Sequence, residues 1–342
     1  MAPKKPKQYL GVREIAKLAH VSPSTVSRVI NYPERTSDSV RERVNRIIQE
    51  YHYVPNQMAK NLFSQSSNSL AIFIHDFTNP FYGLLIQELG QIAFKNQYNL
   101  LICSTLHNKN QEIEYLNYCQ AVRTKGIISI DNHPSNMYEH LHDSIKLVSF
   151  DCKVDSIHYS SVTSNHYQGI ELLLNHLIQL GHRKIAFATV NSPTMQAAKL
   201  RRQAYQQLIG WHHNLPYRED YCQKFEGGNR ATHSGKAIID YFMNLPDPPT
   251  AILCNNDPMA IGTLMYAQSV GIRVPEDLSI AGFDGLTENF SYPRLTTVLQ
   301  DYKKIAQILF DDVVDPSRSS EVHHDIVDVA LSIGETTGPV KK

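Results

Sequence analysis

From residue 68 onward, short apolar runs alternate with longer amphipathic stretches. The runs are Leu70–Ile74, Leu100–Cys103, Gly126–Ile130, Leu147–Phe150, Ile185–Ala188, Ala251–Cys254 and Leu278–Phe283. This alternation predicts parallel β-sheets covered by helices, because each run reads as a buried strand and each stretch between runs as a helix. About 275 residues are too many for one hydrophobic core, so we expect two similar α/β lobes.

The composition is that of an ordinary globular protein: 342 residues, of which 42% are hydrophobic and 19% charged. No segment approaches the ~18 apolar residues of a membrane span, and the first residues lack the apolar segment of a signal peptide. We therefore expect a cytoplasmic protein without a membrane partner. The five cysteines are scattered, with no CxxC or Cys/His ligand spacing, so we expect no disulfide framework, no metal site and no cofactor.

The charges are distributed unevenly, although Lys and Arg (33) balance Asp and Glu (33) overall. Residues 1–65 hold eleven Lys and Arg against five Asp and Glu, a net charge of +6, which leaves −6 for the rest of the chain. A basic head on an acidic body is typical of a nucleic-acid-binding unit joined to a domain that does not bind nucleic acid.

Within this basic head, the apolar residues follow a helical period. Val12, Ile15, Ala16 and Ala19 form one stripe on a helix of about two turns. Ser22 is a good N-cap for a second helix, with Pro23 in its first position, and this helix should run to about Asn31. A third helix is predicted over 37–51, with Val40, Val44, Ile47, Ile48 and Tyr51 on its inner side.

The second helix should bury Val26, Val29 and Ile30, which leaves small polar side chains and one arginine facing outward. Such a first turn suits the major groove of DNA. We predict that Arg28 and Ser24 contact bases, that Pro23 shapes the approach, and that Thr25 and Ser27 contact phosphates. Three arginines of the third helix are available for further phosphates: Arg41, Arg43 and Arg46. The alternative is a small structural three-helix domain.

The residues of this region match the sequence pattern of one known protein family. The segments 11–22, 24–31, 41–44 and 53–56 closely resemble the DNA-binding domain of the lactose-repressor/galactose-repressor family. The resemblance implies a helix–turn–helix domain at 1–54 and a hinge helix at 55–64 that forms only on operator DNA. By motif position, Asn56 caps the hinge helix, Ala59 faces the partner hinge, and Leu62 enters the minor groove. A helix of about eight residues is too short to be stable alone, which agrees with such a role. The alternative is that Leu62 begins the core of the body.

The remainder of the chain resembles the effector-binding body of the same family, which is similar to periplasmic sugar-binding proteins. The matching segments are 76–82, 148–151, 180–187, 255–262, 274–284 and 295–298. The resemblance implies a body at 65–342 with two parallel-sheet lobes, the first at about 69–163 and 302–325 and the second at about 164–300 and 326–336.

The resemblance also implies an effector cleft between the lobes, at the ends of predicted strands, where open parallel sheets bind ligands. Carboxylates, amides and an arginine suit a polyhydroxylated ligand, and aromatic rings can stack on the apolar face of a sugar. Position by position, the cleft residues are Asp76, Asn79, Phe81, Tyr82, Asp151, Arg201, Asn256, Asp284 and Gln300.

The chain departs from the family pattern at three positions. Cys152 stands where arginine is common after the aspartate, and His20 stands where the turn usually has glycine, which His tolerates at positive φ. Arg230 replaces a frequent aromatic residue. Together with Lys199 and Arg201, it would favour a sugar phosphate or another anionic effector. The alternative, which we prefer, is that Arg230 is exposed and pairs with Glu226.

The sequence as a whole predicts a homodimeric transcriptional repressor of carbohydrate genes, bound to a near-palindromic operator and controlled by a sugar or sugar phosphate. Three alternatives remain: a corepressor-dependent regulator of non-sugar metabolism, a sugar-processing enzyme with a DNA-binding head, and a periplasmic binding protein. The enzyme is disfavoured because the chain has no GxxxxGK[ST], GxSxG or HExxH motif, and no catalytic residue is predicted.

Overall fold

The structure is a computed structural model, and it separates into two compact units, Met1–Gln65 and Ser66–Lys342, which are described here one at a time. The residues that it describes are 10–54, 67–75, 79–106, 108–130, 141–152, 159–192, 195–211, 215–226, 231–286 and 293–341.

The first unit contains the three predicted helices, α1 (Val12–Leu18), α2 (Pro23–Asn31) and α3 (Asp38–Glu50), with a short 3₁₀ turn at Pro33–Arg35. Helix α2 begins as predicted: the Ser22 hydroxyl accepts a hydrogen bond from the backbone N–H of Thr25, 3.1 Å away. In the turn before it, His20 has a φ of 51°, the left-handed conformation expected for a position where glycine is usual.

The three helices pack around one small apolar core, made of Ile15, Ala16, Ala19, Val26, Val29 and Val44. The prediction for Tyr51 is wrong, because this side chain is 44% exposed. Helix α3 ends at Glu50, so Tyr51 leaves the apolar stripe at the point where the helical period stops. The outer side of α2 takes no part in the core and remains accessible.

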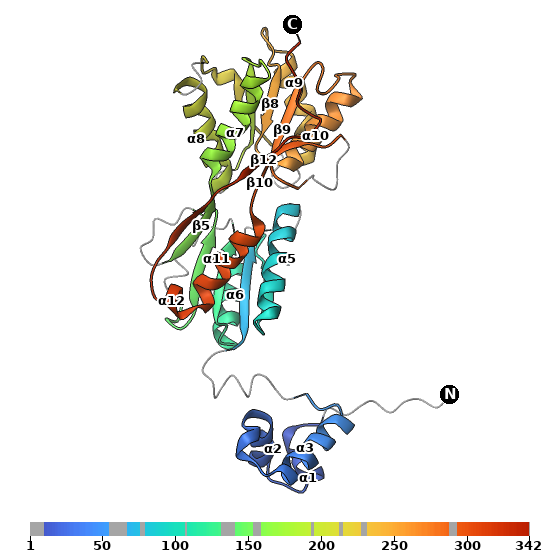
Figure 1. Ribbon diagram of the computed structural model, residues 1–342, viewed down its shortest axis with the longest axis vertical. Helices are drawn as coiled ribbons and strands as arrows, with labels where there is room; N and C mark the ends of the chain where they lie inside the picture. Colours follow the sequence, from blue (N-terminus) through green and yellow to red (C-terminus); the bar gives the residue numbers. More distant parts are fainter. Residues whose placement is uncertain are drawn as a thin grey trace, which may run out of the picture. The chain divides into compact units, whose positions relative to one another are not determined.

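The second unit contains two six-stranded sheets, one in each lobe (Figure 1). The sheet of the first lobe is parallel throughout, with the order β11-β5-β4-β3-β1-β2. Its strands are β1 (Ser69–Ile74), β2 (Asn99–Ser104), β3 (Gly126–Ile130), β4 (Lys146–Phe150), β5 (Ser160–Ser164) and β11 (His324–Val327). The helices of this lobe are α5 (Pro80–Lys95), α6 (Lys109–Ala121), α11 (Tyr302–Val314) and α12 (Pro316–Ser319).

The sheet of the second lobe has the order β12-β10-β9-β8-β6-β7, and only β12 runs antiparallel to its neighbour. Its strands are β6 (Ile185–Val190), β7 (Cys222–Phe225), β8 (Ala251–Cys254), β9 (Ser279–Asp284), β10 (Thr296–Leu299) and β12 (Ala330–Ser332). Its helices are α7 (His166–Gln179), α8 (Gln196–Trp211), α9 (Gly235–Met243) and α10 (Asp257–Ser269), with 3₁₀ turns at Glu219–Tyr221 and Ala231–Ser234.

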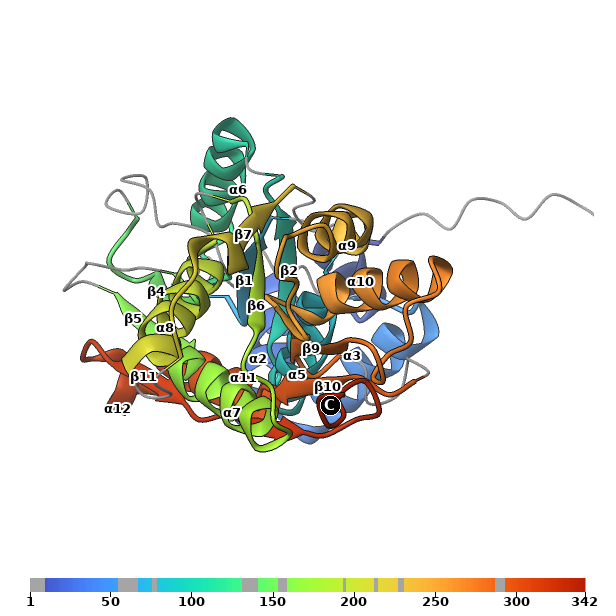
Figure 2. The same cartoon turned by 90° about the horizontal axis from the view of Figure 1, so that it is seen from above.

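Each sheet is covered on both faces. In the first lobe α5 and α11 pack on one face and α6 on the other. In the second lobe α7 and α8 cover one face while α9 and α10 cover the other (Figure 2). The seven predicted strands are all present. Six of them are buried on both sides, which explains their continuous apolar runs, whereas the edge strand β2 leaves Ile102 45% exposed.

The chain passes between the lobes three times: after β5, after β10 and after β11. Parallel strands in both sheets therefore end at the boundary between the lobes, where loops carry side chains into the gap. Among the described residues, no helix is both long and apolar enough to cross a membrane.

Candidate functional site

A cavity lies between the two lobes, and it gathers residues that are far apart in the sequence. It is lined by Asn79, Phe81, Tyr82, Phe150, Asp151, Met195, Ala197, Arg201, Asn255, Asn256, Asp284 and Gln300. The eight predicted effector residues that the structure describes are all in this set. The other two, Asp76 and Arg230, lie outside the described residues.

Two asparagines reach the cavity from the starts of helices, one in each lobe. The side-chain oxygen of Asn79 accepts a hydrogen bond from the N–H of Phe81 (3.0 Å) and caps α5. The oxygen of Asn256 accepts from the N–H of Met259 (3.1 Å) and caps α10. Both caps are structural, and each uses the amide oxygen while the amide nitrogen can still donate.

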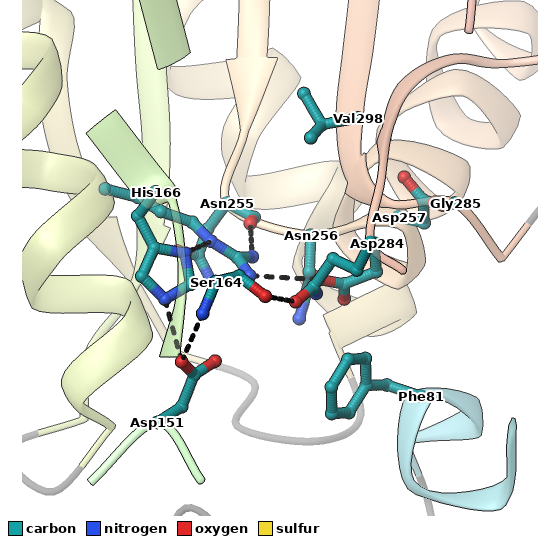
Figure 3. Close-up of polar contacts among 12 residues, drawn as sticks. Phe81, Asp151, Ser164, His166, Asn255, Asn256, Asp257, Asp284, Gly285 and Val298 are labelled. Atoms are coloured by element: carbon teal, nitrogen blue, oxygen red, sulfur yellow. Dashed lines mark hydrogen bonds and ion pairs between the residues drawn. The ribbon is translucent and has the colours of Figure 1, made fainter. Parts of the chain in front are cut away.

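Arg201 is the centre of the polar network of the cleft. Figure 3 shows its partners Asp284, Asn255 and His166, with Asp151 below His166. It is only 3% exposed, and its guanidinium stacks on Phe283 at 3.6 Å from the ring centroid. One terminal nitrogen donates to the carbonyl of Asn255, and the other donates to Oδ1 of Asp284 at 3.1 Å. Both carboxylate and carbonyl acceptors thus hold the side chain in one orientation.

The remaining nitrogen of this guanidinium connects Arg201 to Asp151 of the first lobe through His166. Nε of Arg201 donates to Nδ1 of His166 (3.2 Å), because arginine can only donate. His166 therefore carries its proton on Nε2, which lies 3.1 Å from Oδ1 of Asp151. The same oxygen accepts from the hydroxyl of Thr163 at 2.8 Å. This chain of contacts joins the lobes across the cleft.

A second connection runs through Gln300, on the segment that returns to the first lobe. Its amide nitrogen donates to Oδ1 of Asp284 at 2.8 Å, and its oxygen accepts a short hydrogen bond from the hydroxyl of Ser164. The hydroxyl of Tyr302 donates to the backbone carbonyl of Asp284. All of these side chains except Tyr302 lie at the crossings or the ends of strands.

The two cleft aspartates have unusual backbone conformations, with a φ of 50° at Asp151 and 127° at Asp284. Non-glycine residues rarely adopt positive φ, and such strain is concentrated at functional sites. Each residue follows or ends a central strand, so the strained conformation turns its carboxylate into the gap between the lobes.

The environment separates the acidities of these aspartates. Burial raises the pKa of Asp284 to about 7, although Arg201 opposes this effect. Burial likewise raises the pKa of the neighbouring Asp257 to about 6. For Asp151, burial is outweighed by His166, Arg201 and the Thr163 hydroxyl, which hold its pKa below the usual value. Asp151 is therefore the permanent negative charge of the cleft, and Asp284 titrates near neutral pH.

The cavity has an aromatic wall and little free volume. Phe81 and Phe150 stack with ring centroids 5.7 Å apart and an interplanar angle of 16°. The space that remains is about 30 Å³, far below the ~300 Å³ or more of typical ligand pockets. The lobes are thus closed on their own polar network. The side-chain oxygen of Asn255 is buried there without a hydrogen-bond partner, and an unpaired buried acceptor favours a ligand that donates.

Several cleft residues were not predicted from the sequence: Phe150, Ser164, His166, Met195, Ala197 and Asn255. Phe150 and Asn255 lie inside segments that resemble the family, directly beside the predicted Asp151 and Asn256. Their position next to predicted residues could have identified them as cleft residues. Nothing in the sequence distinguishes His166, which begins α7. The grouping of Lys199 with Arg201 is wrong: one helix carries both, but Lys199 lines a different cavity.

The first unit presents the predicted DNA-binding face of α2. Pro23, Ser24, Ser27 and Arg28 are exposed, and Thr25 is half-buried with its hydroxyl 2.8 Å from that of Ser22. In α3, Arg41 pairs with Asp38 at 2.5 Å, while Arg43 and Arg46 are exposed. The predicted hinge contacts, Asn56, Ala59 and Leu62, lie outside the described residues.

Known protein families match both the first unit and the body of this chain. Residues 12–56 match the profile of "Bacterial regulatory proteins, lacI family", and residues 174–337 match that of a periplasmic binding protein-like domain. The protein named "Probable HTH-type transcriptional repressor ExuR" from Bacillus subtilis (strain 168) is 30% identical over 324 residues, which cover 91% of this chain and 93% of that protein. The catabolite control protein A of Priestia megaterium is 30% identical over 87% of this chain and 89% of its own length.

The fold is also found in solved structures. The structure of the lac repressor dimer bound to operator and the anti-inducer ONPF superimposes with a TM-score of 0.85 at 23% identity, covering 97% of this chain and all of that one. A complex of the transcriptional regulator CelR with cellobiose gives a TM-score of 0.67 at 22% identity, covering 96% of this chain and 99% of that one. Both show the same succession of a helical head and a two-lobed α/β body.

Proposed function

Because this chain belongs to the lacI family of bacterial regulatory proteins and its relatives are transcriptional repressors, we propose that it is a dimeric repressor controlled by a neutral polyhydroxylated ligand, such as a sugar. The observation that carries the proposal is the convergence of eight predicted residues on one interlobe cavity, in a chain whose first unit has the predicted helix α2. A cytoplasmic location and the absence of an enzymatic activity belong to the same proposal.

The DNA half of the proposal rests on α2. Its first turn exposes small polar side chains that allow close approach to a groove, and Arg28 can pair with the major-groove edge of guanine. Arg28 makes no ion pair within the described part of the chain, so its guanidinium is available for such a contact. One α2 reads only a half-site, and a dimer reading two half-sites provides the needed specificity.

The effector half rests on the charge balance of the cleft. The described lining residues include one arginine and two aspartates, and the arginine already donates to Asp284, Asn255 and His166. The cleft therefore has no surplus positive charge for a phosphate. Amide donors from Asn79 and Asn256, the unpaired Asn255 oxygen and the rings of Phe81 and Phe150 suit hydroxyl groups on an apolar ring.

The control mechanism follows from the closed network. A ligand larger than about 30 Å³ has to displace contacts such as Gln300–Asp284 or Asp151–His166, which join the lobes. Replacing those contacts changes the angle at which the lobes are most stable, and that change reaches the DNA-binding heads through the first lobe. An inducer would favour the arrangement that separates the hinges at 55–64, and a corepressor the one that joins them.

Exposed apolar side chains in both lobes support a dimer. In the first lobe these are Phe94 of α5 (86%), Leu106 just after the edge strand β2 (61%) and Tyr118 of α6 (51%). In the second lobe, α10 exposes Met265 (64%), with Val270 (50%) directly after the helix. Large apolar side chains that are this exposed are candidates for a protein–protein interface.

The experiment is to select DNA from a random pool with the purified protein and to measure its affinity with a panel of sugars and sugar phosphates at fixed salt. We expect a near-palindromic site whose affinity changes with one neutral sugar. Phe81→Ala should keep the DNA affinity and lose the response to the sugar. Enrichment of no sequence would contradict the DNA half. A response to phosphorylated sugars alone would contradict the effector half.

A further inference from the structure

The second lobe contains another cavity, between α8 and the edge of the sheet, which we name the α8 pocket. It has a volume of about 360 Å³. Its polar lining consists of Thr189, Ser192, Lys199, Arg202, Gln203, Gln206 and Lys224. Thr189 of β6 and Lys224 of the edge strand β7 are register partners, so they lie side by side on the sheet face that α8 covers. Figure 1 shows α8 on this outer flank of the lobe.

The charge in the α8 pocket is one-sided. Lys199, Arg202 and Lys224 line it, and no lining residue is acidic. Several other basic side chains of this lobe pair with carboxylates, for example Lys184 with Asp247, and Arg218 with Asp220 at 2.7 Å. In the part of the chain that the structure describes, the three cations of the α8 pocket have no ion-pair partner. A cavity of one sign of charge concentrates counter-ions of the other.

Two of the residues that line the α8 pocket hold buried donors without acceptors. Thr189 is 1% exposed, yet its hydroxyl has no hydrogen-bond partner, and Nε of Arg202 is buried and likewise unpaired. Buried polar groups are nearly always hydrogen-bonded in native proteins, so an unsatisfied pair in one cavity indicates a missing acceptor. Cys222 beside Arg202 does not supply a counter-charge, because burial raises the pKa of its thiol against the effect of Arg202.

We propose that the α8 pocket binds the phosphate group of a small molecule, as a site separate from the interlobe cleft. Phosphate offers several acceptor oxygens and up to two negative charges, which match three cations and two unpaired donors. The volume lies within the ~300–1,000 Å³ of small-ligand sites. A nucleic acid fits less well, because its phosphates form an extended row whereas these donors line a single cavity.

The pocket is positioned to influence the cleft. Arg202 follows Arg201, and the two face different cavities because neighbouring helical residues are rotated by about 100°. A phosphate held by Lys199 and Arg202 therefore binds to the same turn of α8 that carries Arg201 and orients it in the interlobe network. Binding at the two sites should be coupled, and the coupling has to be equal in both directions.

The test is calorimetric titration of the full-length protein with inorganic phosphate, sugar phosphates and a nucleoside monophosphate at constant ionic strength. We expect binding that weakens by about tenfold or more in Arg202→Gln and in Lys224→Gln, since each removes one charged donor. Lys236→Gln, which removes an exposed lysine of the same lobe paired with Asp240, is the matched control and should bind normally. Circular dichroism establishes that each variant is folded.

The same two variants distinguish the cavities, because Arg202 and Lys224 line the α8 pocket and neither lines the interlobe cleft. A phosphate bound in the cleft would keep its affinity in Arg202→Gln and Lys224→Gln, whereas one bound in the α8 pocket would lose affinity in both. Equal affinity for inorganic phosphate and esters would identify free phosphate as the ligand, and tighter binding of one ester would identify a metabolite. No binding at millimolar concentration, binding unaffected by Arg202→Gln and Lys224→Gln, or binding of DNA alone would overturn the proposal.

Discussion

Replacing Asp284 by asparagine should make the protein more stable at neutral pH, although it removes a member of a buried ion pair. In the folded protein burial raises the pKa of this carboxyl from 3.8 to about 7, even with Arg201 3.1 Å away. Asparagine keeps the oxygen that accepts from Arg201 and Gln300 and removes the cost of burying the charge. The variant therefore resembles the protonated form of the native protein.

The direction of this stability difference follows from the raised pKa of Asp284. Below about pH 4 the carboxyl is protonated in both the folded and the unfolded chain, so wild type and variant should differ little. Between about pH 4 and pH 7 only the unfolded chain loses the proton, so the wild type is destabilised relative to the variant. At about 1.4 kcal/mol for each pH unit, the interval from 3.8 to about 7 corresponds to at most about 4 kcal/mol. Above pH 7 the difference stays constant.

The assay is urea denaturation of Asp284→Asn and wild type at several pH values from 5 to 8, with the free energy of unfolding compared at each. Asp151→Asn is the matched control, because the pKa of Asp151 is lowered and its charge stabilises the folded state above the unfolded pKa of 3.8. This control should be less stable than wild type by an amount that is constant over the same range. If Asp284→Asn gains no stability relative to wild type between pH 5 and pH 7, the buried-charge reasoning is refuted.

Four other substitutions test the remaining parts of the structure. Arg28→Ala should reduce the ratio of specific to non-specific DNA affinity by about tenfold or more in a salt-matched binding assay, and an unchanged ratio would contradict base readout by α2. Gly282→Ala should lower the free energy of unfolding by about 1–3 kcal/mol, because its Cβ would lie 2.2 Å from Oδ1 of Asp257, whereas Gly83→Ala in open space on α5 should raise it by about 1 kcal/mol. Phe94→Lys should shift the protein from dimer toward monomer in sedimentation equilibrium, and an unchanged dimer would exclude the face of α5.

Local signals determined the helices of the first unit and the central strands. Ser22 and Pro23 mark the start of α2 at the residue where the structure begins it. Six of the seven apolar runs are strands with both faces buried, and the seventh is the edge strand β2. The strands absent from the prediction are polar or short, such as β5 (Ser160–Ser164) and β11 (His324–Val327). Such segments become strands only because a neighbouring strand pairs with them, which no local pattern encodes.

For the cleft, resemblance to the family selected residues at the ends of strands, and the structure brings all of the described ones together. Their partners were invisible in the sequence, since Ser164 meets Gln300 from 136 positions away. His166 has no motif of its own and becomes part of the network because α7 starts beside Asp151. The raised pKa of Asp284 is likewise a consequence of burial, which composition and spacing do not state.

Arg201 and Arg202 show most clearly what the sequence determined and what only the tertiary structure decided. From the sequence alone, Lys199 and Arg201 are grouped with Arg230 in the hypothesis of a cationic cleft, which is not the preferred one. The tertiary structure decided that Arg201 fills the interlobe network while Arg202 and Lys199 line the α8 pocket. The physical reason is that a helix turns about 100° for each residue, so which cavity a side chain enters depends on what packs against each side of the helix.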